Sequence, residues 1–153
     1  MTAVSAYNEF DYFKTHLGGG VASGGAPIDF LSDTLKIALV LSAGAPSLTT
    51  HDFWNDLSAS ELATGNGYTT GGETLASKTV SAPAAGVVTY DCADVVWTFT
   101  GTKTFRYGVV YKDTGTSSTS PLMMLIDFFG ADVGITAGTF TWTVSASGLF
   151  TLT

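Results

Sequence analysis

Side chains that could act as bases or nucleophiles are few in this chain of 153 residues. Its two histidines, His16 and His51, are the available general bases near neutral pH. His51 precedes Asp52, and we interpret the two as neighbours at a helix start, because no serine lies in a strained elbow motif. The single cysteine, Cys92, has no basic neighbour in sequence that would lower its pKa, so we expect a buried, unreactive thiol. The sequence therefore predicts no nucleophilic catalytic centre.

Paired carboxylates are the second possible source of catalysis or metal binding. Asp56 and Glu61 are five residues apart, which on a helix points their side chains away from a common side and disfavours glycoside hydrolysis. We expect Glu61 to accept hydrogen bonds from the glycine-rich turn that follows it. Two further acidic pairs lack calcium-loop spacing and are expected to accept turn amides instead, namely Asp91 with Asp94 and Asp127 with Asp132. We therefore predict no metal ion and no cofactor.

The glycine-dense segment 65–72 (GNGYTTGG) begins like a dinucleotide-binding fingerprint. Its next glycines, Gly71 and Gly72, fall at the wrong spacing, and the segment follows an expected helix instead of preceding one. Phosphate binding requires the amides of a helix N-terminus. The segment therefore predicts an ordered turn between a helix and the strands that follow.

The composition limits the partners of the chain. Charged residues make up 12% of it, about half the share of an average soluble domain, and hydrophobic residues make up 45%. The net charge is −7 and only six residues are Lys or Arg, so we expect no nucleic-acid binding, which needs clustered basic residues. Residues 1–14 lack the pattern of a signal peptide, and no run approaches the roughly 20 apolar residues of a membrane span. We expect synthesis in a reducing cytosol and no membrane partner.

Helical spacing of apolar residues occurs in two places. Residues 5–17 predict a short N-terminal helix, and residues 51–62 predict a further short helix that carries Phe53 and Trp54. The Gly-rich segment 18–27 lies between the first helix and the strands. We therefore divide the chain into a helical N-terminal arm, 1–26, and a β-sandwich domain, 27–153, which we expect to fold without the arm.

Segments of strand character follow one another through the rest of the chain, with turn residues between them. The predicted strands are 35–41, 74–81, 87–91, 95–100, 103–112, 122–129, 139–146 and 149–153. Such a series predicts a mainly β fold, an antiparallel β-sandwich of jelly-roll-like type.

The strand 122–126 (LMMLI) is apolar on both faces, so it needs a cover on its second face, either a helix or another subunit. Apolar residues of the two helices are candidates for contact with a partner protein. The alternative is that they cover the sandwich's own apolar strand. The predicted partner-binding residues are Tyr7, Phe10, Phe13, Leu17, Phe53 and Trp54.

Several segments resemble a group of small structural proteins of tailed-phage particles. They are 35–39 (LKIAL), 56–72, 109–115 (VVYKDTG), 121–128 and 138–152. The resemblance covers the chain from about Asp33 onward, after a similar helical lead. It implies a β-sandwich body without catalytic residues, and a place in the virus particle after synthesis in the host cytoplasm.

The resemblance further implies a capsid decoration, or cement, protein on the capsid surface, with the major capsid protein as its partner. We expect a homotrimer, because several modest patches of a closed oligomer then attach together. The alternative is a host- or glycan-binding module of a tail or head fibre, with Trp54, Tyr68 or Tyr111 as stacking surfaces for sugar rings.

Overall fold

The computed structural model describes residues 2–3, 7–17 and 27–153. Most of the predicted linker 18–27 lies outside these described residues. The strands are β1 (Thr2–Ala3), β2 (Tyr7–Glu9), β3 (Leu35–Val40), β4 (Glu73–Thr74), β5 (Thr79–Ala84), β6 (Val87–Asp91), β7 (Val95–Phe105), β8 (Tyr107–Lys112), β9 (Leu122–Asp127), β10 (Val133–Trp142) and β11 (Phe150–Leu152). The α-helix is α1 (Asp11–Leu17), and the 3-10 turns are Ser42–Gly44, Trp54–Asp56, Ser58–Ser60 and Ser117–Thr119.

The strands form three sheets, in the orders β2-β9-β8-β3-β4, β1-β10-β7 and β11-β6-β5. All pairings are antiparallel except that of β1 with β10. The predicted mainly β class with antiparallel sheets is therefore confirmed, and the arrangement is sandwich-like. The finer jelly-roll comparison stays a prediction.

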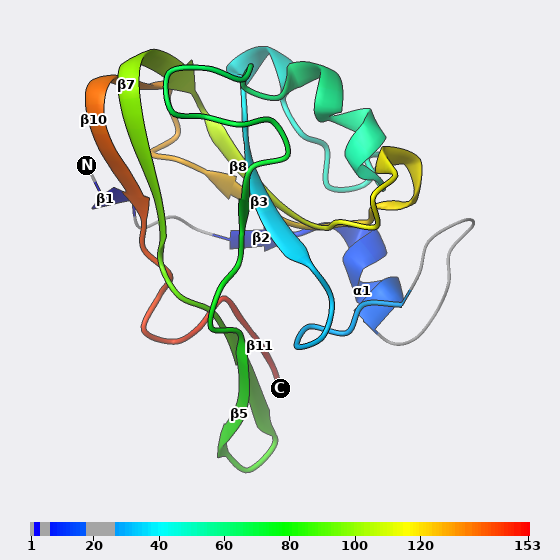
Figure 1. Ribbon diagram of the computed structural model, residues 1–153. Helices are drawn as coiled ribbons and strands as arrows, with labels where there is room; N and C mark the ends of the chain where they lie inside the picture. Colours follow the sequence, from blue (N-terminus) through cyan, green and yellow to red (C-terminus); the bar gives the residue numbers. More distant parts are fainter. Residues whose placement is uncertain (1, 4–6, 18–26) are drawn as a thin grey trace.

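Figure 1 shows the β10–β7 pair on one side of the five-stranded sheet, with α1 and the turns of residues 42–62 on the other. An aromatic core lies between the five-stranded sheet and the β10–β7 pair. The Phe140 ring meets the rings of Phe105 and Phe128 edge to face, with centroids 4.9 and 5.0 Å apart. Strand β7 supplies this core by alternation: Val95, Trp97 and Phe99 are buried, while the residues between them are exposed.

Strand β9 is buried from Leu122 to Ile126. It lies between β2 and β8 within its sheet, and α1 packs against it. The backbone N–H of Phe10, just before α1, donates to the carbonyl of Met123. Of the two predicted covers of the apolar strand, a helix or another subunit, the structure supplies the helix.

The predicted helix 5–17 is too long. Tyr7 and Glu9 pair with Ile126 and Met124 of β9, and the helix begins only at Asp11. The open edge of β9 accounts for the difference, because its backbone groups need partners that a helical segment could not supply.

The predicted helix 51–62 is wrong, because this segment forms two 3-10 turns. The carboxylate of Asp56 accepts the backbone N–H groups of Asp52 and Phe53, at 2.9 and 3.1 Å. Such side-chain bonds compete with helical ones. Residues 60–62 also bond to the edge of β3, where the N–H of Leu62 donates to the carbonyl of Leu39.

Two glycines that fall between the predicted strands, Gly101 and Gly138, instead lie within strands. Gly101 is inside β7, where a Cβ atom would come within 2.8 Å of the Asn66 side chain. Gly138 lies in β10 at a register shift that follows Thr136. A strand glycine thus marks close approach or a bulge, and sequence alone does not separate these from a turn.

The glycine-dense turn 65–72 is ordered and packs against two sheets, the one that contains β7 and the one that contains β3. Gly67 lies against β7 and Gly72 against β3: a Cβ atom on either would be 2.0 Å from the carbonyl oxygen of Thr98 or Ile37, respectively. Both glycines also have positive φ, +89° and +69°. These positions exclude any side chain.

We expect Gly72→Ala to lower the free energy of unfolding by at least about 2 kcal/mol, because it adds a backbone clash to the cost of positive φ. Gly86→Ala is the matched control: its φ is +77°, but its Cβ atom would meet nothing within 4 Å. It should cost about 1 kcal/mol. Urea unfolding measures both, and equal costs would contradict the close packing at Gly72.

The described part of the N-terminal arm is built into the core. Phe10 and Phe13 are 0% and 2% exposed, and the Phe13 ring meets that of Phe150 edge to face. Because of these contacts, we expect that residues 27–153 do not fold stably without the N-terminal arm. Truncating one buried Phe costs about 3–5 kcal/mol, against a typical total stability of about 5–15 kcal/mol.

Removal of residues 1–26 should therefore leave a chain that is largely unfolded at 25 °C. Near-ultraviolet circular dichroism and urea titration of the truncated and full chains measure this. An unchanged unfolding midpoint would instead support the arm and the sandwich as separate units.

Candidate binding surface

The half-buried carboxylate of Glu61 closes the glycine turn. Its Oε1 accepts the hydroxyl of Tyr68 at 2.7 Å and the backbone N–H of Gly71 at 2.6 Å. The Tyr68 hydroxyl in turn accepts the N–H of Leu39 in β3, at 3.0 Å. Burial raises the pKa of Glu61 even though these bonds oppose the shift. The predicted role of Glu61 as an acceptor for the turn is confirmed.

The other acidic residues that the sequence singled out are also bound within the fold. Asp91 accepts the N–H of Cys92, and Asp94 accepts the N–H of Val144, both at 2.9 Å, so these two act as backbone acceptors. The prediction is wrong for the second pair. Asp127 forms a bidentate ion pair with Arg106 at 3.0 and 3.1 Å, and Asp132 accepts the hydroxyl of Ser42.

Cys92 is buried, and burial raises the pKa of its thiol to about 12, as expected for an unreactive cysteine. His51 accepts the N–H of Ser47 through Nδ1. His16 is buried beside the rings of Tyr12 and Phe53. Within the part of the chain that the structure describes, no three His, Cys, Asp or Glu side chains are grouped to hold a metal ion. Over the same residues, no helix has the length and apolar character needed to cross a bilayer.

Three of the predicted partner-binding residues are buried: Phe10, Phe13 and Trp54. The other three, Tyr7, Leu17 and Phe53, keep part of their surface exposed. The Tyr7 hydroxyl accepts the N–H of Ser145 at 3.1 Å. The contact role of these residues stays a prediction, and Leu17 and Phe53 retain the accessible apolar surface that it needs.

The rings predicted as sugar platforms are used inside the fold. Trp54 stacks on Tyr111 with centroids 4.6 Å apart and an interplanar angle of 6°. Tyr68 and Tyr111 are each 2% exposed, and Trp54 is 6% exposed. Their faces are therefore not free to stack on a ligand.

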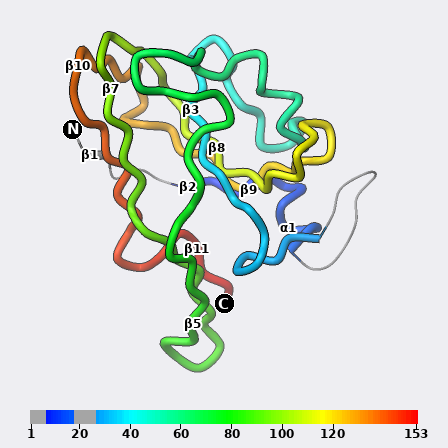
Figure 2. The backbone as a smooth tube through the Cα atoms, in the orientation of Figure 1, coloured from blue at the N-terminus to red at the C-terminus, as the bar shows by residue number. Residues whose placement is uncertain are grey.

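An exposed apolar surface belongs to the β5–β6 hairpin and β11. Figures 1 and 2 show the hairpin projecting from the body, next to the C-terminal strand. Every residue of β5 is exposed. Residues 79–90 include no charged side chain.

Strand alternation gives this small sheet two unlike faces. The pairings Val80↔Tyr90↔Phe150 and Val88↔Leu152 place apolar residues on one face. The paired residues Ser81, Thr89 and Thr151 lie on the other face, which is rich in hydroxyls.

Among the residues that the structure describes, those that cover the apolar face lie near the body. There the Tyr90 and Phe150 rings stack at 4.3 Å, and Phe30 meets both edge to face. Further out, Val80 is 40% exposed and Leu152 is 43% exposed. We call the outer residues Val80, Ala82, Val88 and Leu152 the apolar hairpin face.

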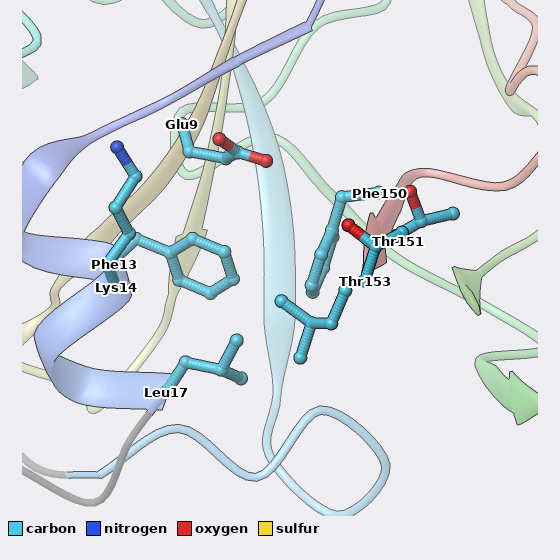
Figure 3. Close-up of a pocket in the computed structure, with 8 residues that line it drawn as sticks. Glu9, Phe13, Lys14, Leu17, Phe150, Thr151 and Thr153 are labelled. Atoms are coloured by element: carbon cyan, nitrogen blue, oxygen red, sulfur yellow. The ribbon is translucent and has the colours of Figure 1, made fainter. Parts of the chain in front are cut away.

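Two grooves meet at the end of β11. One, of about 520 Å³, lies between α1 and β11. In Figure 3, Phe13 and Leu17 of the helix and Phe150 of the strand face one another across it, with Glu9 and Lys14 at its margin. The second, of about 550 Å³, runs along the hairpin and shares Leu152 and Thr153 with the first. The apolar hairpin face is thus continuous with the groove beside α1.

This surface is not among the sites predicted from the sequence. A signal was present, because residues 79–82 and 88–90 alternate Val, Ala or Tyr with Ser or Thr in a stretch without charge. Alternation predicts one buried face, and it does not tell whether the chain itself supplies the cover.

Comparison of the chain with protein-family models, curated proteins and solved structures found no match. The resemblance to phage structural proteins therefore stays a prediction.

Glu61→Ala should lower the free energy of unfolding by about 1–3 kcal/mol, because the N–H of Gly71 and the hydroxyl of Tyr68 lose their acceptor. Glu61→Gln keeps an acceptor oxygen and should be far less harmful. Equal losses in urea unfolding would contradict this role.

Comparison of the wild type with Glu61→Gln also tests the raised pKa of Glu61. The folded chain holds the Glu61 proton more tightly than the unfolded chain, so this contribution to stability is full below the ordinary pKa of 4.5 and is lost as the pH rises through the folded value. We expect the wild type to lose stability relative to Glu61→Gln as the pH rises from about 4 toward neutral. Parallel stability curves would contradict the shift.

Proposed function

We propose that this chain is a non-enzymatic structural protein of a phage particle, a capsid decoration protein that binds and stabilises the lattice of the major capsid protein. The observation that carries the proposal is that the described residues expose apolar side chains, as expected of a chain that works by association with protein: Val80 and Leu152 of the apolar hairpin face are 40% and 43% exposed, and Phe53 is partly exposed. The resemblance of the sequence to small virion proteins gives the class of assembly.

The use of polar groups within the described residues supports a binding role. Glu61, Asp56 and Asp94 bind backbone donors of the chain itself, and Asp127 binds Arg106. These bonds hold turns and strand ends in place. The described residues also expose large apolar side chains, which favours association with another protein.

Attachment to a repeating lattice does not need a strong single contact. An oligomer that presents one modest patch per subunit binds through several patches at once, and the effective concentration of the later contacts raises the total affinity. The half-exposed Leu17 and Phe53 are the predicted lattice contacts that remain accessible. No observation favours the alternative glycan-binding module, since its proposed rings are buried.

The test is the binding of purified protein to shells assembled from the major capsid protein of the same phage. Wild-type protein should cosediment with the shells in a saturable ratio. Phe53→Ala should reduce affinity by about tenfold or more if Phe53 is an anchor of the contact. Leu41→Ala, a half-buried residue outside the predicted contact set, is the control for general destabilisation.

Two results would contradict the proposal. One is the absence of wild-type protein from the sedimented shells and from purified virus particles. The other is turnover of a host polysaccharide that Glu61→Gln or Asp56→Asn abolishes, because it would make the chain an enzyme.

A further inference from the structure

We infer that the apolar hairpin face is the surface on which a second copy of this chain packs. The inference rests on the proposed function in one respect, because it names the partner of the projecting surface in the assembly. Contact with the capsid lattice is left to Phe53, the predicted lattice contact that lies outside this sheet and its groove. The contact joins Val80, Ala82, Val88 and Leu152 of one copy to apolar surface of the next.

Charge favours a second copy as the occupant. Each copy has a net charge of −7, so two copies repel wherever their acidic surfaces meet. Residues 79–90 and 148–153 include no charged side chain, so contact between these residues of two copies brings no like-charged side chains together. Asp91, at the end of β6, lies on the hydroxyl-rich face, and Asp29 lies at the margin of the apolar face beside Val80. A partner selected by opposite charge would find no charged side chain to recognise on it.

The geometry favours contact through the face and not through the edge. Pro83 lies in β5, an edge strand, and the pairing of β5 with β6 shifts register between Ser81 and Ala84. Proline and bulges are the usual devices that prevent an edge from pairing with another strand. The face lacks such a device, and its Ala and Val side chains allow a second layer to approach to about 10 Å.

Packing by a second copy would stabilise the hairpin. A two-stranded hairpin alone is marginally stable in water, and β11 pairs only with residues 88–90 of β6. In the described ranges, no third strand pairs with the outer part of the hairpin. Packing by a second copy supplies the missing layer and extends the Tyr90–Phe150 cluster outward.

The groove between α1 and β11 adjoins this contact. It opens beside the hairpin face, shares Leu152 with it and is lined by Phe13, Leu17 and Phe150. If each hairpin lies on the equivalent hairpin, the assembly is a two-fold dimer. If each hairpin enters the groove of the next copy, the contact is head to tail and closes into a ring such as the predicted trimer.

The test compares charge placed on the two faces of the same strands. Val80→Glu with Leu152→Glu puts carboxylates on the apolar face. Ser81→Glu with Thr151→Glu puts them one residue away, on the hydroxyl face. All four positions are exposed in the single chain, so both double variants should keep the wild-type circular dichroism spectrum.

Light scattering coupled to size-exclusion chromatography gives the mass of each full-length protein. We expect the wild type and the hydroxyl-face variant to be oligomers of the same mass at about 50 μM. The apolar-face variant should have the mass of one chain, with association weakened by at least tenfold, because each buried carboxylate would be unpaired.

A wild-type protein that is monomeric at about 100 μM would overturn the inference, as it would mean that the face stays open or is covered by the chain's own residues 18–26. An apolar-face variant that remains oligomeric would overturn it as well. The shell-binding test and the mass measurement test different claims. An oligomer that does not bind capsid shells contradicts only the proposed function. A monomer that binds them contradicts only this inference.

Discussion

The closure of the β3 edge is the constraint on which the arrangement of the sheets depends. Strand β4 covers this edge only at Lys36 and Ile37. Beyond that point the N–H of Leu39 donates to the Tyr68 hydroxyl, and its carbonyl accepts the N–H of Leu62. Residues 60–72 thereby act as a substitute strand, whose irregular backbone needs the Glu61 carboxylate and positive-φ glycines. Because Gly67 and Gly72 touch β7 and β3, the same segment also sets the spacing of the two sheets.

Much of this architecture was predictable from local pattern. The strands 35–41 and 87–91 and the two-faced burial of 122–126 were identified from apolar runs and alternation, because these properties belong to the strands themselves. The acceptor role of Glu61 was predictable from its position just before the glycine turn. The partners of Asp127 and Asp132 were not, since Arg106 and Ser42 are 21 and 90 residues away in sequence.

The errors share a physical cause, which is competition between local preference and tertiary partners. Helical spacing that includes residues 7–9 gave way to pairing of these residues with β9, whose edge had to be satisfied. Residues 51–62 also have helical spacing, but the Asp56 carboxylate binds backbone N–H groups of this segment and its end bonds to β3, so no α-helix forms. The hairpin face was missed for a related reason. Alternation in residues 79–90 shows that one face is apolar, but only the arrangement of the whole chain shows that nothing described covers its outer part.

The scarcity of charge connects the interior of the fold with its surface. A chain with six basic residues has few ion pairs available, and Lys36, Arg106 and Lys112 are paired with Asp113, Asp127 and Asp33. These pairs tie strands or their adjoining loops together within the body. The hairpin has no charged side chain of its own between residues 79 and 90, and a solvated β-hairpin normally keeps charges to stay soluble. Its composition is that of a strand pair adapted to be covered, which is why we assign it to contact with protein and not with water.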